Sequence, residues 1–85
     1  MRKAKACWVY VLECGDGSYY TGWTNELAKR LKAHQSGKGA KYTRSRLPVK
    51  LLKKWRSKDR SAAMRREASF KSLSRKDKQI KLGFA

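Results

Sequence analysis

The chain has 85 residues, with 23 lysines and arginines against six carboxylic acids and a net charge of +17 at pH 7. This length provides one small hydrophobic core and excludes two separately folded domains, while three Trp, four Tyr and two Phe exclude a disordered basic tail. We therefore expect a single domain over residues 1–85, with its core between about residues 7 and 82. Because such a charge attracts polyanions, nucleic acid is the first expected partner and an anionic membrane surface the second.

Two short strands joined by a tight turn are the strongest local signal. The first strand is expected at about Cys7–Glu13, the turn at Gly15–Gly17 and the second strand at about Ser18–Trp23. Seven strand residues span about 23 Å, so Cys7 and Cys14 are too far apart for a disulfide. Reduced thiols are typical of a reducing compartment, and the apolar run near the N-terminus is too short for a signal peptide or a membrane span. We expect a cytoplasmic, nucleoid-associated protein.

The register of this hairpin follows from the turn length. With a three-residue turn, Leu12 faces Tyr20 and Tyr10 faces Gly22. Side chains alternate between the faces of a strand, so Tyr10 and Tyr20 lie on the same face, and Gly22 leaves space beside the Tyr10 ring. Two interpretations stay open: the tyrosines fill the core, or they belong to a site that a ligand approaches.

A helix is predicted at about Glu26–Gln35. Thr24 or Asn25 can cap it, and an acidic residue in its first turn is favourable at the positive end of the helix dipole. Leu27 and Leu31 are one turn apart and are expected on the buried side.

The same helix carries the first candidate site residues outside the hairpin. Arg30 and His34 are also one turn apart, on a neighbouring stripe, and are close enough to act together. The structural alternative is a solvated arginine and a histidine at the rim of the core.

A glycine-containing basic loop is expected at Ser36–Arg46, followed by a third strand at about Val49–Trp55. Basic residues around an aromatic ring suit contacts to phosphates with one ring free to stack on a base, although such a loop can also be a solvated linker. The candidate nucleic-acid-binding residues of the loop are Lys38, Lys41, Tyr42, Arg44 and Arg46.

A second helix is predicted from Asp59 or Ser61 to about Leu73, and a short third helix opens with a capping box at Ser74–Asp77. Glu67 interrupts the apolar stripe of the second helix. A carboxylate that faces a core is costly unless it is paired, so Glu67 is expected either to bind an arginine or to be a metal ligand.

In this order the motifs resemble the GIY-YIG nuclease family over nearly the whole chain. Trp8-Val9-Tyr10 is similar to the first motif of that family, and Tyr20-Thr21-Gly22 is similar to the second, ten residues later. The helical arginine of the family falls on Arg30, with His34 where some members have a histidine, and the metal-binding glutamate falls on Glu67. The small stand-alone bacterial members and the nuclease subunit that cuts branched DNA are the most similar.

The resemblance implies an α+β fold, in which about three helices flank a small three-stranded antiparallel sheet. It also implies a DNA endonuclease that hydrolyses phosphodiester bonds of branched or damaged DNA in repair or recombination, with one Mg²⁺ or Mn²⁺ ion held by Glu67. Tyr10 or Tyr20 would orient or deprotonate the water, helped by an adjacent cation that lowers the tyrosine pKa, and Arg30 would bind the phosphate. His34 or Tyr42 would assist proton transfer or hold the phosphate.

Two alternatives stay open beside catalysis by the isolated chain. A non-catalytic nucleic-acid-binding protein could keep the fold and the charge, and a nuclease subunit could act only with a targeting partner. DNA is the expected partner, with RNA not excluded, and the chain is expected to be a monomer that does not bind membranes.

Overall fold

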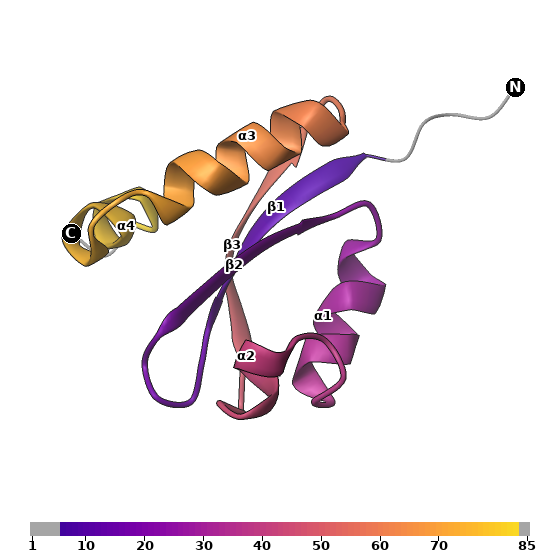
Figure 1. Ribbon diagram of the computed structural model, residues 1–85, viewed down its shortest axis with the longest axis vertical. Helices are drawn as coiled ribbons and strands as arrows, with labels where there is room; N and C mark the ends of the chain where they lie inside the picture. Colours follow the sequence, from indigo (N-terminus) through magenta and orange to yellow (C-terminus); the bar gives the residue numbers. More distant parts are fainter. Residues whose placement is uncertain (1–5, 84–85) are drawn as a thin grey trace, which may run out of the picture.

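The computed structural model describes residues 6–83, which form three strands and four helices (Figure 1). The strands are β1 (Cys7–Glu13), β2 (Tyr19–Thr24) and β3 (Lys50–Ser57). The helices are α1 (Leu27–Gln35), α2 (Lys41–Arg44), α3 (Arg60–Lys71) and α4 (Arg75–Lys81). The predicted α+β class with a three-stranded antiparallel sheet is confirmed, with one helix more than expected.

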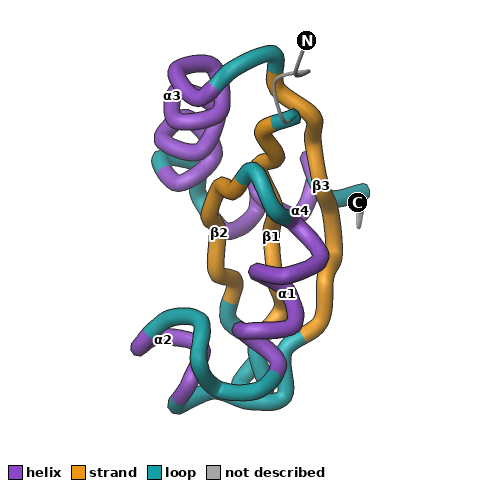
Figure 2. Tube along the Cα trace, turned by 90° about the vertical axis from the view of Figure 1, so that its right-hand side faces the viewer, coloured by secondary structure: helices purple, strands orange, loops and turns teal. Residues whose placement is uncertain are grey.

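Strand β1 is the centre of the sheet. Both neighbours are antiparallel to it in the order β2-β1-β3 (Figure 2). The predicted register is confirmed, because Tyr10 pairs with Gly22 and Leu12 pairs with Tyr20. Because β1 has a strand on each side and helices on both faces, its middle residues Val9 to Leu12 are buried. This burial on both faces explains why the strand is a nearly continuous apolar run.

The helices form one layer on each face of the sheet. Helices α3 and α4 lie on one side, and α1 and α2 lie on the other (Figure 1). On the α1 side, Leu27 and Leu31 pack against the even-numbered side chains of β1, as predicted. On the α3 side, Ala63 and Phe70 pack against odd-numbered ones, Val9 and Val11 among them.

The β1–β2 turn has the predicted length. The backbone amide of Cys14 donates to the carbonyl of Ser18 at 2.8 Å, and Gly17 has a φ of 83°, which favours glycine. Strand β2 begins and ends one residue later than expected. Both cysteines are free and buried.

Helix α1 begins one residue later than predicted, and its cap differs. Glu26 occupies the capping position without a side-chain hydrogen bond to the helix. The hydroxyl of Thr24 accepts from the Glu26 backbone amide at 3.0 Å instead, so Thr24 shapes the turn before the helix.

Two further boundaries needed correction. The basic segment 36–46 is not only a loop, because α2 makes one helical turn in it, and β3 runs from Lys50 to Ser57 instead of Val49 to Trp55. Backbone pairing with β1 extends as far as Cys7 opposite Ser57, so the strand continues through charged residues whose side chains lie in solvent.

The C-terminal helices have side-chain caps close to those predicted. The carboxylate of Asp59 accepts from the Ala62 amide at 2.8 Å, and the Ser74 hydroxyl accepts from the Asp77 amide at 3.1 Å. Within residues 6–83, no helix has the length and hydrophobicity needed to cross a bilayer.

Candidate active site

A buried chain of three polar side chains links β1, α1 and α2. The Tyr10 hydroxyl lies 2.9 Å from Nε2 of His34, and Nδ1 of His34 lies 2.8 Å from the hydroxyl of Thr43. His34 and Thr43 are fully buried, and Tyr10 is 2% exposed. His34 therefore does not lie at the rim of the core, which corrects the structural alternative raised for it.

The hydrogen-bond geometry determines the tautomer of His34. Thr43 has one hydroxyl hydrogen, and it is donated to the carbonyl of Ala40 at 3.1 Å. Nδ1 of His34 must then carry the proton and donate to Thr43, which leaves Nε2 as the acceptor for the Tyr10 hydroxyl. The arrangement holds a neutral imidazole whose free lone pair points at a tyrosine proton.

The pKa values of these groups agree with neutral forms. Burial lowers the pKa of His34 below its ordinary value, and the positive charge of Arg30 lowers it further. Burial also raises the pKa of Tyr10, against the lowering effect of a hydrogen bond from Arg30. The expectation of an acidified tyrosine is therefore wrong for Tyr10, because loss of hydration outweighs the neighbouring cation.

Aromatic rings extend this chain towards solvent. The half-buried ring of Tyr20 lies 5.1 Å from the His34 ring and 6.4 Å from the Tyr10 ring, between centroids. On its other side, Tyr42 stacks on Tyr20 at 6.0 Å. Tyr42 is 37% exposed, so the row of rings runs from the core to the surface.

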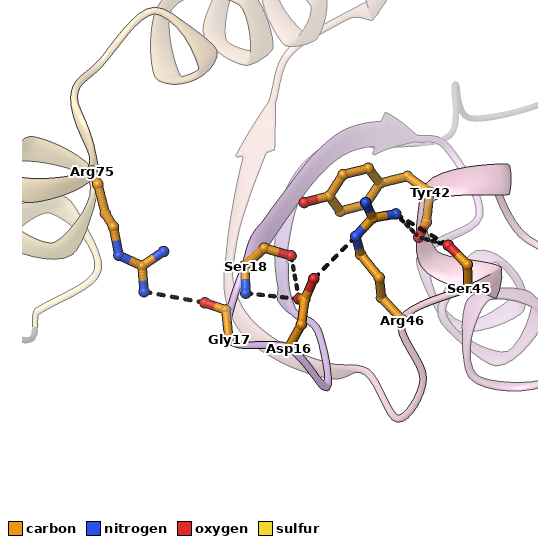
Figure 3. A network of polar contacts seen from close by, with 7 residues as sticks. All are labelled: Asp16, Gly17, Ser18, Tyr42, Ser45, Arg46 and Arg75. Carbon is orange, nitrogen blue, oxygen red and sulfur yellow. Dashed lines mark hydrogen bonds and ion pairs between the residues drawn. The ribbon is translucent and has the colours of Figure 1, made fainter.

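The outer ring of this row is held by a polar network (Figure 3). The guanidinium of Arg46 covers the Tyr42 ring at 3.9 Å from its centroid and donates from Nε to the carboxylate of Asp16 at 3.1 Å. Asp16 also accepts from the backbone amide and hydroxyl of Ser18, and these bonds hold its pKa below the ordinary value. The β1–β2 turn thereby fixes the position of Tyr42.

Two glycines make room for the buried side chains. A Cβ on Gly22 would lie 2.6 Å from the Tyr10 hydroxyl oxygen, which is far inside van der Waals contact. A Cβ on Gly39 would collide with the ring of His34. The space that the sequence predicted beside Tyr10 is present, and it is filled by the tyrosine hydroxyl itself.

Arg30 is an exposed cation whose charge acts on this buried chain. Its side chain contributes to the pKa values of both Tyr10 and His34, so it lies beside their hydrogen bond. It also lines an open cleft of about 320 Å³ between the end of β2 and α1. The cleft is lined by Trp23, Thr24, Asn25, Glu26, Lys29, Arg30 and Ala33.

The predicted nucleic-acid-binding residues separate into two groups. Lys38, Lys41 and Arg44 are exposed and line one shallow basic pocket at α2. Tyr42 and Arg46 belong instead to the stacked network described above. The role of all five in binding nucleic acid stays a prediction.

Glu67 comes from α3, in the other helical layer. Its carboxylate lies 3.3 Å from Nζ of Lys71, so the partner is a lysine of the same helix and not the predicted arginine. The negative charge of Glu67 adds to the raised pKa of Tyr10, which places the carboxylate within electrostatic range of the hydroxyl. Within the described residues, no hydrogen bond joins it to Tyr10, Tyr20, Arg30 or His34.

Glu67 is the predicted metal ligand of the site. Among residues 6–83, no three His, Cys, Asp or Glu side chains come together as a metal-binding group. Mg²⁺ commonly binds through one or two carboxylates, with waters and substrate phosphates as its other ligands. The carboxylate of Glu67, with 21% of its side chain exposed, is compatible with such an ion.

Thr43, Asp16 and Gly39 were not among the predicted site residues. Thr43 orients His34, Asp16 holds Arg46, and Gly39 gives His34 its space. A threonine beside Tyr42 and a glycine in a basic segment carry no recognisable signal, because their role depends on where α2 folds back against α1.

Residues 6–81 match the family described as the GIY-YIG catalytic domain. A UPF0213 protein of Bacillus cereus is 54% identical over 79 residues, which cover 93% of this chain and 81% of that protein. A UPF0213 protein of Streptococcus sanguinis is 56% identical over 77 residues, covering 91% and 85% of the two chains.

Two solution NMR structures are similar to this fold. The UPF0213 protein BH0048 from Bacillus halodurans has 46% sequence identity and a TM-score of 0.60, covering 94% of this chain and 87% of that one. The protein EF2693 from E. faecalis has 41% identity and a TM-score of 0.62, covering 99% and 91%.

Proposed function

This chain belongs to the GIY-YIG family, and we propose that it is a divalent-metal-dependent DNA endonuclease acting on branched or damaged DNA. The observation that carries the proposal is the hydrogen bond between the Tyr10 hydroxyl and Nε2 of His34, placed beside the exposed Arg30. Phosphodiester hydrolysis needs a base for water, a cation for the phosphate and stabilisation of the leaving oxygen. The tyrosine, the histidine and the arginine supply the first two.

Tyr10 and His34 act together as the base. The attacking water transfers its proton to the Tyr10 oxygen while the Tyr10 proton moves to Nε2 of His34. Because Thr43 accepts from Nδ1, the resulting imidazolium keeps its hydrogen bond. This relay needs no preformed phenolate, in agreement with the raised pKa of Tyr10.

Arg30 binds the non-bridging oxygens of the phosphate, since its guanidinium presents several donors in a fixed plane. Glu67 is the residue that would hold a Mg²⁺ or Mn²⁺ ion, and it would have to leave Lys71 to do so. Such an ion, when bound, supplies charge stabilisation at the phosphate and at the leaving oxygen.

The surface around the site suits DNA. Lys38, Lys41 and Arg44 gather in one pocket at α2, where their charges suit contacts to phosphates. The Tyr42 ring already contacts Tyr20 and Arg46, so it would have to release one of them to stack on a base. These contacts read no base edges, so the proposal favours recognition of DNA structure over sequence and a role in repair or recombination.

The test is cleavage of a panel of labelled linear, flapped, forked and single-stranded DNAs with Mg²⁺, with Mn²⁺ and with EDTA. The proposal expects nicks in the branched or single-stranded substrates that disappear in EDTA. Equal cutting in EDTA would refute the metal role. Binding without cutting on every substrate would favour a non-catalytic binding protein or a subunit that needs a partner.

A further inference from the structure

A second basic groove lies on the other side of α3 from Glu67. It has a volume of about 520 Å³, and five cationic side chains line it, from β3, the turn that follows it, and helices α3 and α4. They are Arg56, Lys58, Arg65, Arg66 and Lys81. In the part of the chain that the structure describes, no acidic residue lines the groove.

These five cations have no ion-pair partner among the described residues. The cations of the ion pairs within residues 6–83 are Lys29, Arg46, Lys50 and Lys71, and none of them lines the groove. Within residues 6–83, the Arg65 guanidinium donates one hydrogen bond, to the hydroxyl of Ser61 at 2.8 Å. Five like charges at one groove repel one another, so a bound anion would reduce the electrostatic repulsion that destabilises the free protein.

Ser57 supplies an independent sign of a ligand. It also lines the groove and is 8% exposed, and within the described residues its hydroxyl is buried without a hydrogen-bond partner. Buried hydroxyls nearly always have a partner, because an unpaired one loses its bonds to water without replacement. Rotation of the side chain towards the groove would let this hydroxyl donate to a phosphate oxygen among the surrounding cations.

The helix geometry separates this groove from the candidate active site. With about 100° per residue, Ala62, Arg65 and Ser69 form one stripe of α3, on the opposite side of the helix from Glu67. The groove also lies beside β3, whereas Tyr20 is on β2, and these strands are on opposite edges of the sheet (Figure 2). One phosphate cannot contact both places.

The groove continues into a smaller cavity with an aromatic wall. Arg66, Ser69 and Lys81 line both, and the smaller one, of about 90 Å³, adds Trp55, Phe70 and Leu73. A basic channel beside an aromatic surface is typical of sites that follow a nucleic-acid backbone.

We propose that this groove binds the sugar–phosphate backbone of a second nucleic-acid strand, while another strand of the same molecule lies at Tyr10 and Arg30. The inference rests on the proposed function, and it names the substrate as DNA with two arms. This groove lies beside α3, whereas Arg30 lies on α1, on the other side of the sheet (Figure 1). A linear duplex engaged at the active site therefore leaves this groove empty, and a branched molecule fills both places.

The test measures binding in EDTA, so that it does not depend on cutting. A fluorescein-labelled fork with two single-stranded arms is titrated at several KCl concentrations with wild type, with the double variant Lys58→Gln/Arg65→Gln, and with the charge-matched control Lys53→Gln/Lys76→Gln. The control residues are exposed and line no cavity described above. Each lost contact lowers the slope of log affinity against log salt by about 0.7 for single strands.

The proposal expects the groove variant to lose about 1.4 from this slope and the control to keep the wild-type value. It also expects Ser57→Ala to weaken fork binding without lowering the Tm of the free protein, because the hydroxyl has no partner to lose. Equal slopes for the two double variants would overturn it. The proposal would also fail if the groove variant bound the fork like wild type but lost binding to phosphatidylserine vesicles. That result would assign the groove to a membrane surface. If the two double variants bind the fork equally, metal-dependent cutting by the wild type is still tested by the cleavage panel. If the wild type does not cut, binding in EDTA still tests the groove.

Discussion

The Tyr10 hydroxyl donates a hydrogen bond to Nε2 of His34, a residue 24 positions later in the chain. Helix α1 brings the histidine over β1, and Thr43 holds its other nitrogen. Such a pair is fully satisfied in the resting protein and can still transfer a proton. The same hydrogen bond therefore satisfies two buried polar groups in the core and provides the proposed general base.

Replacing each tyrosine by phenylalanine distinguishes their roles. Tyr10→Phe removes the proton relay and is expected to lower the single-turnover cleavage rate by about 10²–10⁴-fold, the usual contribution of a positioned acid or base. Tyr20→Phe keeps the ring stacked on Tyr42, and within the described residues its hydroxyl makes no hydrogen bond, so a smaller loss is expected. A larger effect at Tyr20 would assign the base to that residue instead.

The stability of the protein should fall with acid in a window set by His34. Its pKa in the folded state is lower than the ordinary 6.5, so the unfolded chain binds the proton more readily. The contribution of the neutral ring is fully present above about pH 6.5 and is lost as the pH falls through the lower folded value, by at most about 1.4 kcal/mol per pH unit.

Urea unfolding between about pH 7.5 and pH 5 measures this effect, in a range above the ordinary pKa values of carboxylates. His34 is the single histidine of the chain, so a His34→Gln variant serves as the control. The variant should be less stable at neutral pH but should lack the slope. A wild type as stable at pH 5 as at pH 7.5 would contradict a buried, neutral imidazole.

Gly22→Ala tests the close packing at the tyrosine. The new methyl group would meet the Tyr10 hydroxyl and its ring carbon at 2.6 and 2.8 Å, so the ring must shift and the geometry of its hydrogen bond to His34 must change. Overpacking of this kind costs about 1–3 kcal/mol. Thermal unfolding should show the loss, and cleavage should fall more than DNA binding. Gly17→Ala is a suitable comparison, since no atom within 4 Å would meet its methyl group, although its φ of 83° disfavours alanine. A Gly22→Ala protein with wild-type cleavage would show that the tyrosine position is unimportant.

The hairpin could be predicted closely because its signals are local. Strand alternation and the turn glycines define the pairing of Tyr10 with Gly22 without information from elsewhere in the chain. The caps at Asp59 and Ser74 were predictable for the same reason. The end of β3 was not, because its last residues are strand only through their pairing with β1.

The chemistry of the site depends on contacts between distant segments of the chain, which could not be predicted from the sequence. Arg30 and His34 could be placed together from helical spacing, but the burial of His34 comes from α2, whose single turn brings Thr43 over the imidazole. The pKa of Tyr10 was expected to fall beside a cation and instead rises, since burial is the larger effect. Glu67 was recognised as unusual, but its partner Lys71 was not.

Substitution of Glu67 tests the nuclease assignment most directly. Its side chain is partly exposed and its ion pair with Lys71 is of the kind that contributes about 0–1 kcal/mol, so Glu67→Ala should fold. Glu13→Ala is the matched control, because Glu13 also pairs with one lysine, Lys50, at 3.3 Å. The measurement is single-turnover cleavage of a forked DNA in Mg²⁺, with binding of the same DNA measured in EDTA. The account predicts that Glu67→Ala binds like wild type and does not cut, while Glu13→Ala does both. Equal cleavage by wild type and Glu67→Ala would contradict it.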